Sequence, residues 1–256
     1  MRMPIGKQAY ALRNLRKRKE TDKSAAYASK YFKSYDAQDS KPERINETFY
    51  DDDCIQTAKS MLGMTLARKL ESEILRCKIV EVEAYMSNAD KASHSYNFKR
   101  TKRNEAMFMK PGTLYVYMTY GMYYCMNISS KGHGDAVLIR GVEPFKGLET
   151  MQKNRAKINS KQNQIKNVTN GPSKLCQALK ITKQLDKIDM SNSDEIWLEK
   201  GTSVDENDIV TCKRIGLKET TSGDWATKPL RFYIYGNMFV SIKDKLEEKI
   251  KEDNFT

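Results

Sequence analysis

Apolar and polar residues recur with two different periods along the first folded part of the chain. Over residues 57–70 the apolar positions return every three or four residues, and this spacing predicts a helix. Over residues 74–85 the period changes to two, so that Glu81, Glu83 and Tyr85 fall on the same side. We therefore expect a strand here that presents two carboxylates and an aromatic ring on one face.

Turn signals divide the following part of the chain into short strands. Pro111-Gly112-Thr113 precedes residues 114–120, and Gly121 separates these from residues 122–129, which predicts a β-hairpin with Tyr120 at or next to its tip. Further strands are expected at residues 136–142, 195–199, 209–215 and 230–235, and helices at residues 147–155 and 172–181. Because most neighbouring strands are joined by short turns, we predict an α+β fold with one mainly antiparallel sheet.

The positive charge of the chain is concentrated in two segments, and this distribution is what bears on its partner. The chain has 256 residues with 45 Lys+Arg and 33 Asp+Glu, a formal charge of +12. Residues 1–48 carry +6 of it and residues 151–169 carry +5. We interpret residues 1–48 as a flexible basic arm and 49–256 as the folded domain. The arm has two interpretations: a functional segment, which is a nuclear-import signal or binds phosphate, and a solubilising tail. The loop at residues 151–169 either follows a phosphate backbone or extends into solvent.

Composition excludes several other classes of protein. No apolar run approaches the roughly 18 residues of a membrane span, and the first twenty residues are basic, so we expect an intracellular protein without a membrane partner. The five cysteines are scattered without a C-x-x-C pair, which favours reduced, mostly buried thiols. The two histidines, His94 and His133, exclude a multi-histidine metal site. If the protein is an enzyme, its acid–base chemistry is therefore expected to fall mainly to carboxylates.

Residues 115–124 contain five tyrosines. Tyr115 and Tyr124 are interpreted as ordinary strand formers. Tyr120 is different, because a bulky ring beside a glycine at a hairpin tip occupies a normally polar position and is suited to wedge into a base stack. Together with Glu83 and Tyr85 it supplies a wedge, stacking rings and a carboxylate, which are the parts needed to handle a base extruded from a duplex.

Long motifs in this order closely resemble the alkyladenine (3-methylpurine) DNA glycosylase family. The similarity extends from about Phe49 to Val240. It is carried by IVEVEAY at residues 79–85, His94-Ser95, Arg103-Asn104, MFMKPGTLYVY at 107–117, YGMY at 120–123, CMNIS at 125–129, GPSKLCQAL at 171–179 and KPLRFY at 228–233. The resemblance implies one α+β domain around a curved antiparallel sheet with a protruding hairpin.

The same resemblance implies a monofunctional DNA repair enzyme without lyase activity and without a metal or other cofactor. It would flip damaged purines such as 3-methyladenine, 7-methylguanine, hypoxanthine and ethenoadenine out of double-stranded DNA and hydrolyse the N-glycosidic bond, leaving an abasic site. It would act as a monomer in the nucleus, an organelle being the other location considered. The second hypothesis, from another class, is a non-catalytic protein that senses distorted DNA or RNA with the same wedge.

Residue roles follow from the matching motifs. Glu83 would be the general base that activates water, and Arg140 would hold that water and the carboxylate. Tyr85, Tyr117 and His94 would line the pocket of the flipped base, with Asn127 as a steric filter against guanine. Tyr120 would fill the gap in the duplex, with Met122 and Tyr123 nearby and Thr101 and Lys174 as phosphate contacts. Residues 96–100 depart from the glycine/arginine-rich pattern of the family, which puts phosphate contacts in that loop in doubt.

Overall fold

The computed structural model describes residues 42–71, 73–155 and 165–254. Most of the arm predicted at residues 1–48 lies outside these ranges, as does the middle of the basic loop predicted at residues 151–169. Residues 42–48 are described, and Arg44 forms a β-bridge with Glu199 and places its guanidinium 4.1 Å from the centre of the Trp197 ring. The boundary between arm and domain stays a prediction.

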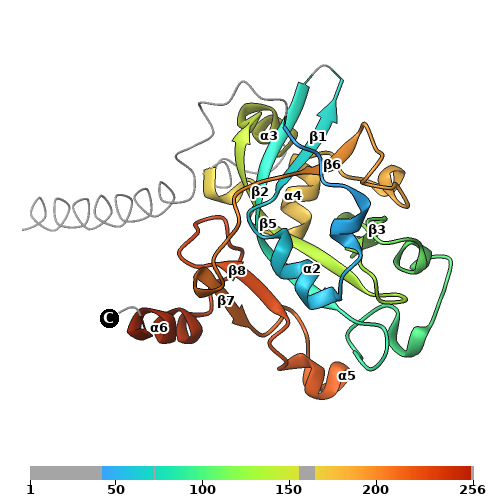
Figure 1. The fold of residues 1–256 in the computed structure, drawn as a ribbon, viewed down its shortest axis with the longest axis vertical. Helices are drawn as coiled ribbons and strands as arrows, with labels where there is room; N and C mark the ends of the chain where they lie inside the picture. Colours follow the sequence, from blue (N-terminus) through green and yellow to red (C-terminus); the bar gives the residue numbers. More distant parts are fainter. Residues whose placement is uncertain (1–41, 72, 156–164, 255–256) are drawn as a thin grey trace, which may run out of the picture. The chain divides into compact units, whose positions relative to one another are not determined.

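The described strands form one antiparallel sheet, with the order β3-β4-β5-β2-β1-β6 and with β8 pairing both β2 and β7 (Figure 1). The strands are β1 (Thr65–Leu70), β2 (Glu73–Tyr85), β3 (Leu114–Thr119), β4 (Tyr123–Ser129), β5 (Ala136–Lys146), β6 (Ile196–Glu199), β7 (Ile209–Cys212) and β8 (Arg231–Ile234). This confirms the predicted α+β class and the antiparallel sheet.

Short helices cover the sheet. They are α2 (Cys54–Met61), α3 (Leu148–Arg155), α4 (Pro172–Ala178), α5 (Glu219–Ser222) and α6 (Lys245–Asn254). Helix α2 packs on β2 and β5, α4 packs on β4 and β5, and α6 lies beside β7 (Figure 1). The start of α2 is fixed by the Asp53 side chain, which accepts hydrogen bonds from the backbone N–H groups of Ile55 and Gln56. Helices α5 and α6 had no counterpart in the sequence pattern.

The helix predicted at residues 57–70 is wrong in its second half. Helix α2 ends at Met61, and the chain turns at Gly63, whose φ is +83°. A Cβ at this position would lie 2.0 Å from the Thr202 carbonyl oxygen, so glycine is required there. The rest of the segment is β1, whose first four residues are all buried, and a strand buried on both faces has no alternating pattern to distinguish it from a helix.

The other predicted elements are observed with shifted ends. Strand β2 covers the segment predicted at 74–85, and β5 extends the one predicted at 136–142 to Lys146. Strands β3 and β4 pair from Leu114 opposite Ile128 to Thr119 opposite Tyr123, with Tyr120 in the connection between them. All five cysteines are buried and unpaired, as expected. None of the described helices is long and apolar enough to cross a membrane.

Candidate active site

Strand register places two of the predicted site residues, Glu83 and Asn127, in one transverse row. Residues directly opposite each other on antiparallel strands point to the same face. The row that contains Glu83 runs across β3, β4, β5, β2 and β8 as Tyr115, Asn127, Leu138, Glu83 and Arg231. Strands lie about 4.8 Å apart, so the backbones at Glu83 and Asn127 are about 10 Å apart. The general base and the steric filter predicted from the motifs therefore share one face of the sheet.

A β-bulge directs Arg140 toward the carboxylates of β2. Glu81 is opposite Gly141 and Val82 is opposite Ile139, so Arg140 is an extra residue on β5 without a partner in the register. Its Nε donates to Glu81 Oε1 and its Nη1 to Glu83 Oε2, each at 3.3 Å. Burial lowers the pKa of Arg140, but the charges of Glu83 and Glu81 outweigh this, so the pKa lies above its usual value and the guanidinium stays charged.

The Glu83 carboxylate is fully buried and held by three donors. Oε1 accepts the backbone N–H of Ile215 at 2.7 Å, and Oε2 accepts the Tyr85 hydroxyl at 2.8 Å and Arg140 Nη1 at 3.3 Å. An ionised carboxylate has about four acceptor positions. Three donors therefore fix the orientation of the group and leave one lone pair for a water molecule.

Tyr85 is clamped between this carboxylate and a second buried ion pair. The Arg214 guanidinium lies 4.4 Å from the centre of the Tyr85 ring. Its two terminal nitrogens bind the two oxygens of Asp90 at 2.6 and 2.8 Å, with both side chains inaccessible to solvent. Burial and the nearby Glu83 charge raise the pKa of Tyr85 well above its usual value, so its hydroxyl remains a hydrogen-bond donor.

His94 and Tyr117 meet at the rim of the same face. Their ring centres are 4.6 Å apart with an angle of 75° between the planes. His94 Nδ1 is 2.9 Å from the Tyr115 hydroxyl, which fixes the ring orientation. Partial burial and the Arg103 guanidinium, which lies 5.4 Å from the centre of the Tyr117 ring, lower the pKa of His94 to about 4. The imidazole is therefore neutral at pH 7, with Nδ1 engaged by Tyr115.

Asn127 on β4 is the second residue of the row and is held in place by a hydrogen bond. Its Nδ2 donates to the carbonyl of Tyr115 at 3.1 Å, and only 5% of the residue is exposed. This bond ties the amide to the neighbouring strand β3, so its position does not depend on a flexible side chain. Its role as a steric filter remains a prediction.

The connection between β3 and β4 carries the exposed aromatic residue predicted there. Tyr120 is 88% exposed and has a φ of +51°, which side-chain-bearing residues rarely adopt. Met122 is 65% exposed, and Tyr123 at the start of β4 is half-buried. A large ring at a strained and solvent-exposed position points to function, because neither packing nor backbone preference explains it.

The two predicted phosphate contacts lie on separate surface segments. The exposed Thr101 bonds to Asn104 Oδ1 from its backbone nitrogen at 2.7 Å and from its hydroxyl at 2.9 Å. Lys174 on α4 donates from Nζ to Asn170 Oδ1 at 2.7 Å. Burial, followed by the charge of Arg155, lowers the pKa of Lys174. Contact with phosphate remains a prediction for both residues.

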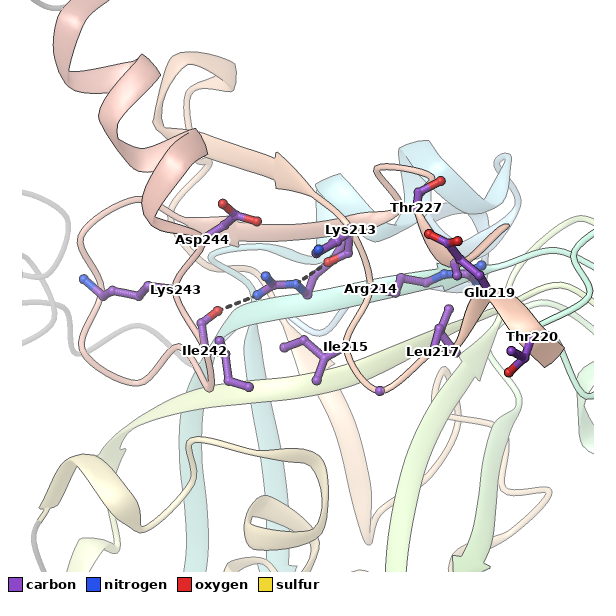
Figure 2. Close-up of a pocket in the computed structure, with 13 residues that line it drawn as sticks. Lys213, Arg214, Ile215, Leu217, Glu219, Thr220, Thr227, Ile242, Lys243 and Asp244 are labelled. Atoms are coloured by element: carbon purple, nitrogen blue, oxygen red, sulfur yellow. Dashed lines mark hydrogen bonds between the residues drawn. The ribbon is translucent and has the colours of Figure 1, made fainter. Parts of the chain in front are cut away.

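Figure 2 shows a separate cavity of about 490 Å³ whose lining includes Ile215, Leu217 and Ile242. The backbone N–H of Ile215 donates to Glu83. Buried Arg231 braces the cavity wall by donating to the carbonyl oxygens of Lys213 at 2.9 Å and Ile242 at 2.7 Å, shown as dashed lines in Figure 2. None of the side chains predicted to bind the base lines this cavity. In the part of the chain that the structure describes, no cluster of histidine, cysteine or acidic residues could hold a metal ion.

Sequence reasoning missed the residues that hold the predicted ones in place. They are Glu81, Asp90, Tyr115, Arg214 and Arg231. Arg231 lies 150 positions from its partner Glu81, and Arg214 lies 124 positions from Asp90. No local period or spacing links such pairs. Glu81 alone had a signal, because it shares the polar face of β2 with Glu83.

Comparison with known proteins agrees with the family resemblance found in the sequence motifs. The sequence profile of the family described as methylpurine-DNA glycosylase (MPG) matches residues 48–238. The chain is 44% identical over 212 residues to the human protein named DNA-3-methyladenine glycosylase, covering 80% of this chain and 70% of that protein. It is also similar to a probable DNA-3-methyladenine glycosylase of Encephalitozoon cuniculi (46% over 191 residues; 73% and 88% covered) and to a putative 3-methyladenine DNA glycosylase of Clostridium perfringens strain SM101 (44% over 209 residues; 78% and 100% covered).

Proposed function

Because this chain belongs to the methylpurine-DNA glycosylase family, we propose that it is a DNA repair enzyme that hydrolyses the N-glycosidic bond of damaged purines in duplex DNA. The observation that carries the proposal is Glu83, a fully buried carboxylate with one lone pair left for water. Burial alone does not indicate catalysis, because Glu81 on the same face is equally buried and paired. The unused lone pair of Glu83, which can accept a hydrogen bond from water, is what favours a catalytic role over simple DNA binding.

Glu83 acts as the general base. The water oxygen bonds to C1′ of the damaged nucleotide, Glu83 takes a proton from the water, and the C1′–N bond breaks with its electron pair leaving on the base. A cationic base such as 3-methyladenine or 7-methylguanine leaves as a neutral molecule. A neutral base such as hypoxanthine or ethenoadenine also takes up a proton from solvent. The products are the free base and an abasic site, and no lyase step follows.

Arg140 fixes the carboxylate and the water. Its Nη1 donates to Glu83 Oε2 at 3.3 Å, which supports a role in orienting the carboxylate and the water that binds it. The rings of Tyr85, His94 and Tyr117 line the face on which a flipped purine stacks. The neutral His94 bonds the edge of the base, and the fixed amide of Asn127 obstructs the exocyclic amine of an undamaged guanine.

Tyr120 fills the space that the flipped nucleotide leaves in the duplex, assisted by Met122 and Tyr123. Its exposure and its position between β3 and β4 suit this wedge role. Thr101 and Lys174 bind phosphates on either side of the lesion. We further propose that the enzyme works as a monomer and that the basic cluster Arg13–Lys19 directs it to the nucleus.

The test is single-turnover release of hypoxanthine from a duplex oligonucleotide without added metal. Glu83→Gln should reduce the rate by at least roughly 100-fold, the usual contribution of a general base. Glu199→Gln is the matched control, because Glu199 is also buried and paired with an arginine, Arg76, but lies on β6 away from the row. An equal loss in both variants would mean that Glu83 matters for folding only, and an unchanged rate would refute its role as base.

A further inference from the structure

The candidate base belongs to a buried group of four charges. Glu81 and Glu83 on β2 have completely buried side chains, and the arginines that pair with them, Arg140 on β5 and Arg231 on β8, are 9% and 3% exposed. Arg140 bridges both carboxylates, whereas Arg231 contacts Glu81. The formal charge of the four side chains is zero. Removing any one of them leaves an unbalanced charge in a site from which water is largely excluded.

Glu81 accepts one hydrogen bond more than Glu83. Oε1 accepts Arg140 Nε at 3.3 Å, Arg231 Nη1 at 3.1 Å and the Ser241 hydroxyl at 2.8 Å, and Oε2 accepts the Ser241 backbone N–H at 2.6 Å. Two of these donors are charged arginines, whereas Glu83 contacts one. Glu81 is therefore placed to fix the position of both arginines, although it lies two residues from Glu83 on the same face.

The segment Phe239–Ser241, which follows β8, lies close to Glu81. A Cβ at Gly141 would lie 2.7 Å from the Phe239 carbonyl oxygen and 3.2 Å from Glu81 Oε2, so only glycine permits this approach. Gly141 is also the residue opposite Glu81 at the bulge that exposes Arg140 to both carboxylates. The close contacts at Glu81 and the direction of Arg140 thus have the same structural origin.

From these contacts we infer that Glu81 and Arg231 are positioning residues that act through Arg140. They hold its guanidinium between the two carboxylates and balance its charge, so that Glu83 is oriented by Arg140 without being neutralised by it. This inference rests on the proposed role of Glu83 as the general base. It assigns to Glu81 and Arg231 a role in setting the protonation of Glu83, in addition to any contribution to folding.

The inference predicts shifts of opposite sign for the two members of the pair. Glu81→Gln leaves one excess positive charge beside Glu83, which favours the ionised carboxylate but makes it a weaker base. Arg231→Gln leaves one excess negative charge, which favours protonation. Charges at a few ångströms displace a titration by about one pH unit or more. The double variant restores a sum of zero and should return to the behaviour of the unaltered protein.

The remaining groups around Glu83 do not titrate near neutral pH. Tyr85 on β2, Tyr117 on β3 and Cys125 on β4 all have a pKa raised by burial, and all stay protonated. Arg140 on β5 and Arg214 after β7 have a pKa above the usual value, because nearby acidic groups outweigh burial, and both stay charged. His94 at the rim is the same in every variant compared. A difference between variants on the acid side of a pH–rate profile therefore reports the charge balance at the carboxylates.

The experiment measures single-turnover release of 7-methylguanine against pH, since this cationic base needs no proton to leave. The acid-side midpoint of the rate should fall by roughly one unit in Glu81→Gln, with a lower plateau, and rise by roughly one unit in Arg231→Gln. It should lie within a few tenths of a unit of the unaltered value in the double variant. Glu81→Asp and Arg231→Lys keep the charges and should keep the midpoint even if they melt at lower temperature.

Two results would overturn the inference. One is a midpoint that is unchanged, or displaced in the same direction, in both single variants. The other is a double variant less stable toward heat than either single variant, because charge balance should make it the more stable protein. Glu83→Gln, measured in parallel, separates this failure from that of the proposed function: if it retains full activity, the assignment of the base is wrong, whatever the pair does.

Discussion

Replacing Tyr120 by asparagine should weaken binding to damaged DNA while leaving the fold as stable as before, or more stable. The Tyr120 side chain is 88% exposed, so the fold loses almost no packing when it is removed. Its φ of +51° is unfavourable for tyrosine, whereas asparagine is among the residues enriched in this left-handed region. The substitution therefore separates the role of the ring in binding from any role in folding.

The two effects can be estimated separately. A tyrosine held in a sparsely populated backbone region costs on the order of 1 kcal/mol, part of which asparagine recovers. In a domain of this size, that is an increase in melting temperature of about 2–4 °C at most. If the ring stacks between base pairs, its loss removes about 1–3 kcal/mol of binding free energy, or roughly a 5- to 150-fold increase in Kd.

Binding should be measured by fluorescence anisotropy with a hypoxanthine-containing duplex, in a Glu83→Gln background so that the lesion is not consumed. Leu246→Gln is the control, since Leu246 on α6 is also a large exposed apolar residue, at 66%. It should leave Kd unchanged within about twofold, so that loss of exposed apolar surface alone is not the cause. Equal affinity of Tyr120→Asn and unaltered Tyr120 for the lesion duplex would refute the wedge role. A loss of several kcal/mol of stability would refute the reasoning about strain.

Three further outcomes are expected. The NMR titration midpoint of His94 should lie below the ordinary value of about 6.5, toward 4, and Arg103→Gln should raise it. Because the unfolded chain binds this proton before the folded protein does, the contribution of His94 to the free energy of unfolding falls as the pH decreases from about 6.5 to 4. Asp90→Asn should lower the free energy of unfolding by about 3–5 kcal/mol, measured in urea, since it leaves the Arg214 charge buried without its partner. Deleting residues 1–41, which lie outside the described residues, should reduce the salt dependence of DNA binding by a log–log slope of about 0.9 per lost phosphate contact, with single-turnover release unchanged; an identical slope would make the arm a passive tail.

The sequence predicted elements well where a local signal was present. The change to period two at residues 74–85 and the glycine turns around β3 and β4 are local, and the corresponding strands are observed. The helix predicted at residues 57–70 failed because its apolar residues serve two elements. Gly63, the residue that separates them, is required by a contact with Thr202, which lies 139 positions further along the chain.

The residues of the candidate site also divide into those with a local sequence signal and those that only the fold brings together. Motifs identified Glu83, Arg140 and the aromatic residues, because these lie in continuous stretches that resemble a known family. Tyr115 lies in β3 as a buried strand residue, as its spacing predicted, and only the fold brings its hydroxyl to His94. Glu81 illustrates the limit most clearly. By local pattern alone it is indistinguishable from Glu83, since both alternate on one strand between apolar residues, and only the family resemblance assigned a role to Glu83.

The difference between these two glutamates arises from what the other strands supply. At Glu81 the bulge on β5, the close approach at Gly141 and the arrival of Arg231 and Ser241 deliver four donors, three of them to Oε1. At Glu83 the backbone of Ile215 and the side chains of Tyr85 and Arg140 deliver three, and one lone pair is left. The two carboxylates thus differ in their partners, and only long-range pairing of the sheet decides which donors each one receives. The opposite pH shifts expected for Glu81→Gln and Arg231→Gln test whether the partners of Glu81 set the charge balance around Glu83.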